Sequence, residues 1–156
     1  MASKPTKAPT GTGSPFPRWV LRIVTPLHTS LNRLTGGRFF NTFQGEEVCF
    51  VTMRGAKSGR LRTIPLMYIP YKDGILLVAS QGGAHKNPAW YYNLVKNQEI
   101  EANYRGRRMK LRARLATAAE KPALWPICEQ RFPPFAEYRT RTSRDIPIFV
   151  CEPTKG

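Results

Sequence analysis

The sequence predicts an α+β fold in which antiparallel strands form the core and helices flank them. Three observations support this prediction: apolar runs of strand length from residue 47 onward, turn signals between these runs, and two helix-start signals after residue 86. The chain has 156 residues, of which 41% are hydrophobic. It is therefore long enough to form one domain with a buried core.

The first half of the predicted core consists of three strands. Val48–Val51 reads as a buried strand that runs into a turn over residues 54–59. Residues 62–71 read as the next strand, and Lys72-Asp73-Gly74 has the composition of a hairpin turn. The apolar run over residues 75–79 then predicts a core strand that ends at a glycine pair.

The second half adds a hairpin and a final strand. Residues 98–104 and 107–115 are predicted to pair around Arg105-Gly106, and residues 146–151 form the last strand. In the second hairpin strand, four cations alternate with apolar residues and so share one face: Arg108, Lys110, Arg112 and Arg114. This row is either a solvated charged face over the core or a surface that follows phosphates.

Helix signals separate these strands. We expect Asn87 to cap a helix with Pro88 at its first position, and this helix ends near Asn97. The Thr117–Glu120 spacing fits a capping box and opens a helix that extends to about Arg131. The aromatic residues over 132–138 form a loop or a short helix.

The N-terminal part differs in composition from the rest. Residues 1–17 read as a disordered basic tail, residues 18–37 as an amphipathic helix with a Gly-Gly stop, and residues 38–156 as the folded domain. The helix either caps the core or lies on a membrane surface, since the first 34 residues contain no Asp or Glu.

Charge and cysteine usage limit the classes of partner. Twenty-five Lys and Arg against ten Asp and Glu give a net charge of +15. This favours an anionic partner or reflects a generally basic surface. Nucleic acid is disfavoured, because aromatic residues do not interleave with the basic strand. The three cysteines lack metal-site or disulfide spacing, and no apolar run is long enough to span a membrane. We expect a cytoplasmic protein without a metal.

Two glycine-rich stretches carry the chemistry, one over residues 52–62 and one over residues 79–91. Both combine glycines, hydroxyls and cations in turns, which suits the binding of a large anionic cofactor. The first stretch lacks the glycine spacing of a Walker A loop. Since no acid–base pair or nucleophile elbow is visible, we expect the cofactor to carry the reaction. Ser80 is the candidate catalytic hydroxyl, and its alternative role is a turn hydroxyl that bonds backbone.

Three motifs resemble one family. They are G-A-K-S-G-R-L-R-x-x-P-L from Gly55, V-A-S-Q-G-G-A-H-K-N-P-x-W-Y-x-N-L from Val78, and R-T-S-R-D-I-P-I-F-V-C-E-P from Arg141. Together they are similar to the deazaflavin-dependent nitroreductases of the flavin/deazaflavin oxidoreductase superfamily. The resemblance implies an FMN-binding-like split β-barrel, a mainly antiparallel six-stranded barrel with flanking helices.

The resemblance also implies a cofactor and a reaction. The cofactor is coenzyme F-420, an 8-hydroxy-5-deazaflavin with a phosphodiester and an oligoglutamate tail. The reaction is hydride transfer from the reduced cofactor to a quinone, a conjugated enone or lactone, or a nitroaromatic compound. The oligoglutamate tail of this cofactor is a polyanion, so it is a specific partner for the positive net charge of the protein.

Site residues follow from the same motifs. Those implied to bind the phosphate and acidic tail are Lys57, Ser58 and Arg62. Those implied to line the ring and ribityl region are Pro65, Ala79, Ser80, Gln81, Gly82, Gly83 and Ala84, and those implied to close the site are Asn87, Trp90 and Tyr91. The acceptor is expected against Met67, Ser80, Phe135 and Tyr138.

Two kinds of departure affect this expectation. Similar proteins often have Tyr at the positions of Met67 and Phe135, and Lys at the position of Gln81. Two other functions remain open: an FMN-dependent oxidoreductase, or a barrel that binds a deazaflavin or a lipid without catalysis.

Overall fold

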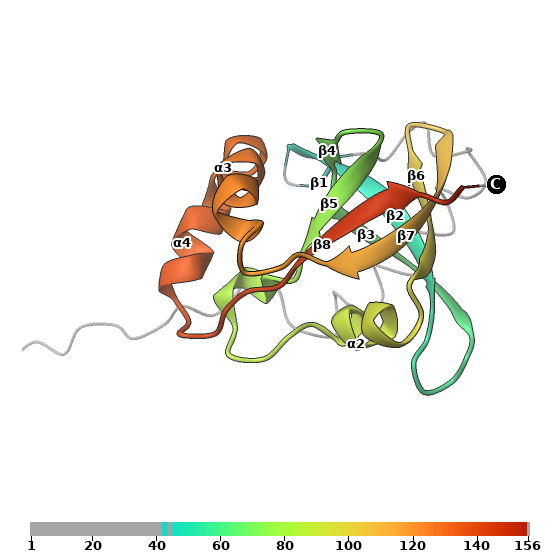
Figure 1. Cartoon of the computed structure of the whole chain (residues 1–156), viewed down its shortest axis with the longest axis horizontal. Helices are drawn as coiled ribbons and strands as arrows, with labels where there is room; N and C mark the ends of the chain where they lie inside the picture. The colour runs from blue at the N-terminus through green and yellow to red at the C-terminus, as the bar shows by residue number, and fades with distance from the viewer. Residues whose placement is uncertain (1–41, 44, 156) are drawn as a thin grey trace, which may run out of the picture.

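The computed structural model describes residues 42–43 and 45–155. The tail and the amphipathic helix expected over residues 1–37 lie outside these residues, so both stay predictions. Within the described part, eight strands and three α-helices follow one another (Figure 1). The strands are β1 (Thr42–Phe43), β2 (Glu46–Arg54), β3 (Leu61–Met67), β4 (Ile69–Tyr71), β5 (Gly74–Val78), β6 (Glu99–Tyr104), β7 (Arg107–Leu115) and β8 (Ile148–Pro153).

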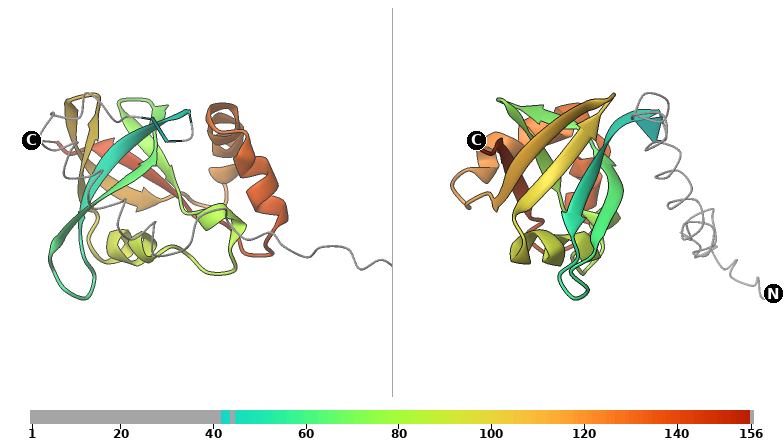
Figure 2. Two further views of the ribbon diagram at one scale, coloured as in Figure 1. Left: turned by 180° about the vertical axis from the view of Figure 1, so that it is seen from behind. Right: turned by 90° about the vertical axis from the view of Figure 1, so that its right-hand side faces the viewer.

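Every strand pair in this sheet is antiparallel. The strand order is β1-β2-β6-β7-β8-β5-β4, and β3 pairs with the other edge of β2. The strands wrap around a common interior with α2 across one end (Figure 2). The strand predicted over residues 62–71 is interrupted at Tyr68 and becomes β3 and β4. Counting these two as one and setting aside the two-residue β1, the barrel has the six strands expected.

The sheet separates two apolar clusters. One fills the barrel interior and includes Cys49, Leu77 and Phe149, while the other lies between the sheet and the helices α3 and α4 and includes Leu76 and Trp125. Both faces of β5 and β8 are therefore buried. This is the reason why these two strands are continuous apolar runs in the sequence, whereas β7 alternates between apolar and charged residues.

Three helices flank the barrel: α2 (Ala89–Lys96), α3 (Lys121–Arg131) and α4 (Pro134–Thr140). Helix α2 closes one end, where Leu94 is fully buried in the interior cluster. At the start of α3, the amide of Thr117 donates to Glu120 and the amide of Glu120 donates to Thr117 Oγ1. The reciprocal bonds of the predicted capping box are thus present, but they lie in the turn that precedes α3, because the N-cap of the helix is Glu120 and no side chain caps it.

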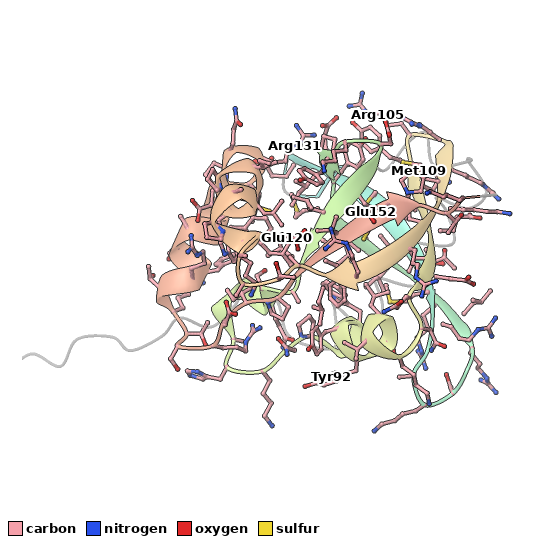
Figure 3. All side chains as sticks on the ribbon, in the orientation of Figure 1. Tyr92, Arg105, Met109, Glu120, Arg131 and Glu152 are labelled. Atoms are coloured by element: carbon pink, nitrogen blue, oxygen red, sulfur yellow. The ribbon has the colours of Figure 1, made fainter. Side chains whose placement is uncertain are left out.

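At the end of the barrel away from α2, the Glu47 carboxylate forms ion pairs and a hydrogen bond with several side chains. Arg105 and Arg131 lie at this end in Figure 3, and both form ion pairs with Glu47. The hydroxyl of Tyr104 also donates to Glu47, and the Tyr104 ring stacks on Tyr68 at a centroid distance of 3.6 Å. These contacts attach α3 to the barrel and leave the α2 end for the glycine-rich segments.

Candidate functional site

The first glycine-rich segment, here called the cationic turn (Gly55–Arg62), comprises the turn after β2 and the first two residues of β3. Its backbone closes on itself, because Gly55 N donates to Arg60 O at 2.8 Å and Gly59 N donates to Gly55 O at 2.9 Å. A Cβ atom at Gly55 would lie 2.8 Å from Ser58 Oγ and 3.4 Å from Arg62 Nε. The missing side chain of the buried Gly55 therefore leaves room for the Ser58 hydroxyl and the Arg62 guanidinium to lie side by side on the turn.

The cations of this turn are not neutralised by other parts of the described chain. Lys57 and Arg62 are exposed, and neither side chain has an ion pair or hydrogen bond with another described residue. The amide of Arg60 donates to Ser58 Oγ at 3.3 Å. The predicted tail-binding residues Lys57, Ser58 and Arg62 thus stand together on one turn with positive charge available for a ligand.

Helix α2 anchors the cationic turn. Ala56 N donates to Asn93 Oδ1 at 2.8 Å, and Lys96 Nζ donates to Ala56 O at 2.7 Å. Sequence reasoning gave Asn93 no role, although it lies within the second motif, at its penultimate position. The motif therefore contained the signal for a residue that joins the two glycine-rich segments.

The second segment, here called the serine loop (Ala79–Asn87), follows β5. Three successive residues have positive φ: Gln81 at 46°, Gly82 at 64° and Gly83 at 80°. The left-handed conformation is strained for the non-glycine Gln81, and such strain tends to occur at functional sites. Ser80 is only 7% exposed, and its hydroxyl has no hydrogen-bond partner among the described residues. A buried hydroxyl without a partner is costly, so this oxygen suits a ligand.

Helix α4 packs against the serine loop. A Cβ atom at Gly83 would lie 2.6 Å from Tyr138 O, and Arg141 Nη1 donates to Gly82 O at 3.3 Å. The structure therefore brings Tyr138 beside the loop, although the two are far apart in sequence. Both Ala79 and Gly83 are buried, whereas Gln81 and Gly82 are exposed and Ala84 is half-buried.

The expected cap of α2 is wrong. Pro88 occupies the N-cap position, and no side chain caps the helix. The side-chain oxygen of Asn87 instead accepts a hydrogen bond from Arg144. A tertiary partner has replaced the local one, because the guanidinium offers a charge-assisted hydrogen bond.

The other predicted residues lie in or near the core. Trp90 and Tyr91 pack on Phe149 at centroid distances of 5.9 and 5.7 Å, which seats α2 in the barrel end. Pro65 lies in β3 opposite Phe50. Their contact with a cofactor stays a prediction.

The three expected acceptor residues besides Ser80 share the cluster beneath α3 and α4. Met67 and Tyr138 are half-buried in it, and Phe135 is 3% exposed. The ring of Phe135 is 6.2 Å from that of Tyr138 and 4.9 Å from that of Phe132. Phe135 therefore serves the core in this structure, while Tyr138 contacts the serine loop through its backbone carbonyl.

The two segments lie at opposite ends of α2. The serine loop leads into the first residue of α2, and the cationic turn contacts Asn93 and Lys96 near its end. Eight helical residues span roughly 12 Å. An elongated ligand, with a ring at one end and negative charge at the other, is needed to contact both.

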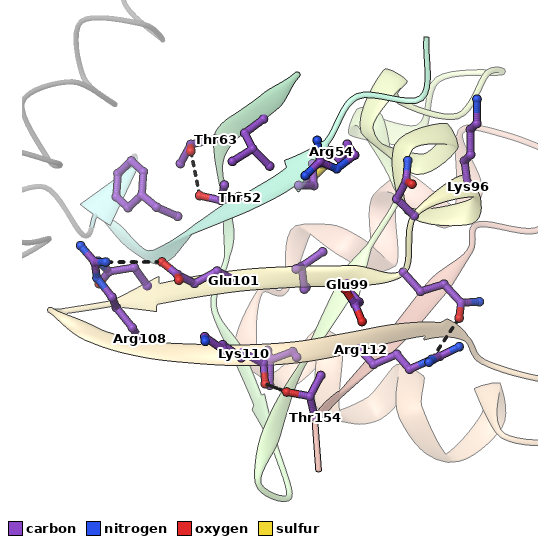
Figure 4. Close-up of a pocket in the computed structure, with 18 of the residues that line it drawn as sticks. Thr52, Arg54, Thr63, Lys96, Glu99, Glu101, Arg108, Lys110, Arg112 and Thr154 are labelled. Atoms are coloured by element: carbon purple, nitrogen blue, oxygen red, sulfur yellow. Dashed lines mark hydrogen bonds and ion pairs between the residues drawn. The ribbon is translucent and has the colours of Figure 1, made fainter. Parts of the chain in front are cut away.

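A separate hollow of about 920 Å³ lies across β3, β2, β6 and β7, and none of the predicted site residues lines it (Figure 4). Three residues of the basic row of β7, Arg108, Lys110 and Arg112, border this hollow. Arg108 lies 3.9 Å from the Glu101 carboxylate, and Arg112 donates to Gln98. These partners favour the interpretation of the row as a solvated charged face.

Cysteine chemistry has no support at this site. The thiols of Cys49, Cys128 and Cys151 are free and buried, and burial raises the pKa of Cys49 and of Cys128 to about 12. In the described part of the chain, no group of three His, Cys, Asp or Glu residues could hold a metal ion. No helix found there is both long and apolar enough to cross a bilayer.

Comparison with known proteins identifies the family. The sequence model of the family described as F420H(2)-dependent quinone reductase matches residues 24–153. An F420H(2)-dependent quinone reductase of Mycobacterium tuberculosis is 33% identical over 141 residues, which cover 85% of this chain and 95% of that protein.

Solved structures agree with this match. A structure described as F420-H2-dependent reductase FDR-A is 36% identical with a TM-score of 0.62, and the match covers 67% of this chain and 93% of that one. A second structure, described as a domain-swapped dimer, is 31% identical with a TM-score of 0.64 and covers 81% of this chain and 96% of its own. The chain therefore belongs to the F420H(2)-dependent quinone reductase family, and it is an oxidoreductase whose cofactor is coenzyme F-420.

Proposed function

We propose that this chain passes a hydride from reduced coenzyme F-420 to a quinone at the serine loop, while the cationic turn holds the acidic end of the cofactor. Reduced F-420, when bound, supplies the hydride from carbon 5 of its deazaflavin ring. The observation that carries this assignment is the Ser80 hydroxyl, which is buried and has no partner among the described residues.

The cationic turn fits the phosphodiester and the oligoglutamate tail. The cations of Lys57 and Arg62 are exposed, and Ser58 Oγ and Arg62 Nε both face the backbone of Gly55. Each well-formed charge-assisted hydrogen bond stabilises a complex by about 1.5–3 kcal/mol. Because this turn is open to solvent, salt screens its attraction for the tail.

The serine loop fits the ring and the acceptor. The acceptor oxygen gains negative charge as the acceptor takes up a hydride. We assign Ser80 as the hydrogen-bond donor to that oxygen, since its hydroxyl has no partner among residues 42–43 and 45–155. Gln81, Gly82 and Ala84 line the ring on this proposal, and Tyr138 and Met67 face the acceptor. Conjugated enones and nitroaromatic compounds present similar oxygens and are further acceptors to test.

Ser80→Ala tests this assignment. We expect turnover with menadione to fall roughly ten- to a hundredfold, with little change in the dissociation constant of F-420. Turnover is followed by the return of the oxidised deazaflavin absorbance. If Ser80→Ala leaves turnover unchanged, the hydroxyl serves only the turn. Tighter binding of FMN than of F-420 by the wild type would favour the FMN alternative, and cofactor binding without turnover on any acceptor would favour a carrier.

The N-terminal composition supports a further part of the proposal, a peripheral contact with an anionic membrane. Residues 1–34 contain five Lys or Arg and no acid, together with the apolar stripe of residues 20–34. Each cation near an anionic surface contributes about 1 kcal/mol. Such a contact would bring the enzyme to a lipid-soluble quinone. Cosedimentation with phosphatidylglycerol vesicles at low salt is expected for the full chain and not for a chain starting at Arg33, and a full chain that stays in the supernatant would contradict it.

A further inference from the structure

One arginine connects both ends of the serine loop. Arg144 lies in the third sequence motif, between α4 and β8, and the function described above gives it no role. Its Nε donates to Ala84 O at 3.1 Å, its Nη1 to Ala79 O at 3.1 Å and its Nη2 to Ser80 O at 3.0 Å. Nη1 also donates to the side-chain oxygen of Asn87. A single guanidinium thus accounts for four hydrogen bonds to one loop.

No local interaction could replace this fork. The loop includes three residues in the left-handed region. Its backbone is held by short-range bonds such as Gly83 N to Ser80 O at 2.9 Å and, at its first residue, by Ala79 N to Pro147 O at 2.9 Å. Ala79 is buried, so its carbonyl needs a donor from the protein, and Arg144 provides one. The Ser80 carbonyl accepts from Arg144 in addition to Gly83 N. Only the planar guanidinium provides several donors in a fixed fork, which an ammonium group does not reproduce.

Neighbouring cations do not share this task to the same degree. Arg141 makes one bond to the loop, to Gly82 O at 3.3 Å, and is engaged with Glu137. Asp145, next to Arg144, pairs with Lys121 at 2.8 Å. Arg144 has no ion pair with an acid in the described part of the chain, so the loop is its principal partner.

We propose that Arg144 is the positioning residue of this site: its guanidinium holds the serine loop in the strained conformation that presents the Ser80 hydroxyl and the bare glycine turn to the cofactor ring and acceptor. The part that concerns Ser80 rests on the function proposed above. Arg144 acts through the loop and does not itself contact substrate.

The first test measures the loop itself, without cofactor or turnover. The variant Arg144→Lys keeps the positive charge and loses the planar guanidinium with its several donors. The matched control is Arg139→Lys, because Arg139 pairs with Glu129 and stacks over Trp125 away from the loop. In hydrogen exchange of the cofactor-free protein, we expect peptides over residues 79–87 to exchange about tenfold faster in Arg144→Lys. The control should match the wild type there, and the barrel strands should stay protected in both.

The second test asks whether Arg144 works through Ser80. We expect Arg144→Lys to lower turnover about tenfold and to weaken F-420 binding severalfold. Ser80→Ala should then lower turnover further by about twofold only, much less than its effect in the wild-type background. A purely structural role predicts that the two effects multiply.

The outcomes separate the two proposals. Unchanged exchange over residues 79–87 together with unchanged F-420 affinity in Arg144→Lys would overturn the role of Arg144, whatever Ser80 does. If Ser80→Ala has no effect on turnover in the wild-type background, the proposed role of the Ser80 hydroxyl as a donor is wrong. The hydrogen-exchange measurement then decides by itself whether Arg144 positions the loop. Should Arg144→Lys fail to fold, Asn87→Ala removes one of the four bonds, and a severalfold faster exchange of the loop is then the expected result.

Discussion

The cationic turn and the serine loop, which lie at the two ends of α2, differ in exposure and in what holds their backbones. The cationic turn is open to solvent, its Lys57 and Arg62 have no described partners, and its backbone is closed by its own hydrogen bonds. The serine loop instead buries Ala79, Ser80 and Gly83, and its backbone contacts Arg144 and α4. An exposed cationic end attracts charge over distance and tolerates movement, whereas a buried end holds a hydroxyl in place.

The largest expected difference between these ends concerns their glycines. Gly83 has a φ of 80°, and a Cβ there would lie 2.6 Å from Tyr138 O, whereas Gly59 has a φ of 67° with open space around it. Gly59→Ala should lower the free energy of unfolding by about 1–2 kcal/mol, because of the left-handed backbone alone. Gly83→Ala adds a clash with α4 and should lower the free energy of unfolding by about 3 kcal/mol or more. Urea unfolding of both variants measures the difference, and equal costs would mean that the serine loop is no more constrained than the turn.

The next effect concerns charge at the cationic turn. Lys57→Ala and Arg62→Ala should each weaken F-420 binding by about tenfold, which corresponds to about 1.4 kcal/mol. Added salt should weaken the wild type and reduce the difference between it and these variants, since the turn is exposed. Titration followed by deazaflavin fluorescence measures this. A loss of affinity that does not depend on salt would contradict an electrostatic role.

A smaller effect concerns the link between the two ends. Asn93→Ala removes the acceptor of Ala56 N and leaves the cations of the turn unchanged. We expect F-420 affinity to fall only severalfold, because the turn stays closed by Gly55 and Arg60. Hydrogen exchange should quicken at residues 55–60 and not at residues 79–87. Faster exchange in the serine loop would show that the ends are coupled through α2.

The smallest effect comes from a region that belongs to neither end. The hydrogen bond from Arg114, supported by the amide of Thr117, lowers the pKa of Glu120 to about 2. Its contribution to stability is therefore complete above the ordinary carboxyl pKa of about 4.5 and is lost as pH falls towards 2. Glu120→Gln should lower the Tm slightly at pH 7 and flatten its decrease between pH 5 and 2. F-420 affinity at pH 7 should not change, and a change would mean that α3 influences the site.

Much of this protein could be predicted from local patterns. The strands over residues 98–104 and 107–115, the capping box at Thr117 and Glu120, and the helix after Pro88 all depend on residues close together in the chain. Their alternation, turn chemistry and capping hydrogen bonds act over a few positions, so the sequence contains their cause. The three motifs likewise identified the family and its cofactor.

Only the tertiary structure decided which distant residues serve the site. Asn87 looked like a helix cap, yet its oxygen accepts from Arg144, which is 57 positions away. The cationic turn is anchored by Asn93, 37 positions from Ala56, and Phe135 is committed to the core beneath α3. These outcomes depend on which donors and surfaces the closed barrel brings within hydrogen-bond distance. At Asn87, the charge-assisted hydrogen bond from the Arg144 guanidinium takes the place of the weaker helix-capping bond that was expected. The pattern of neighbouring residues does not contain this contact, because Arg144 is distant in the sequence.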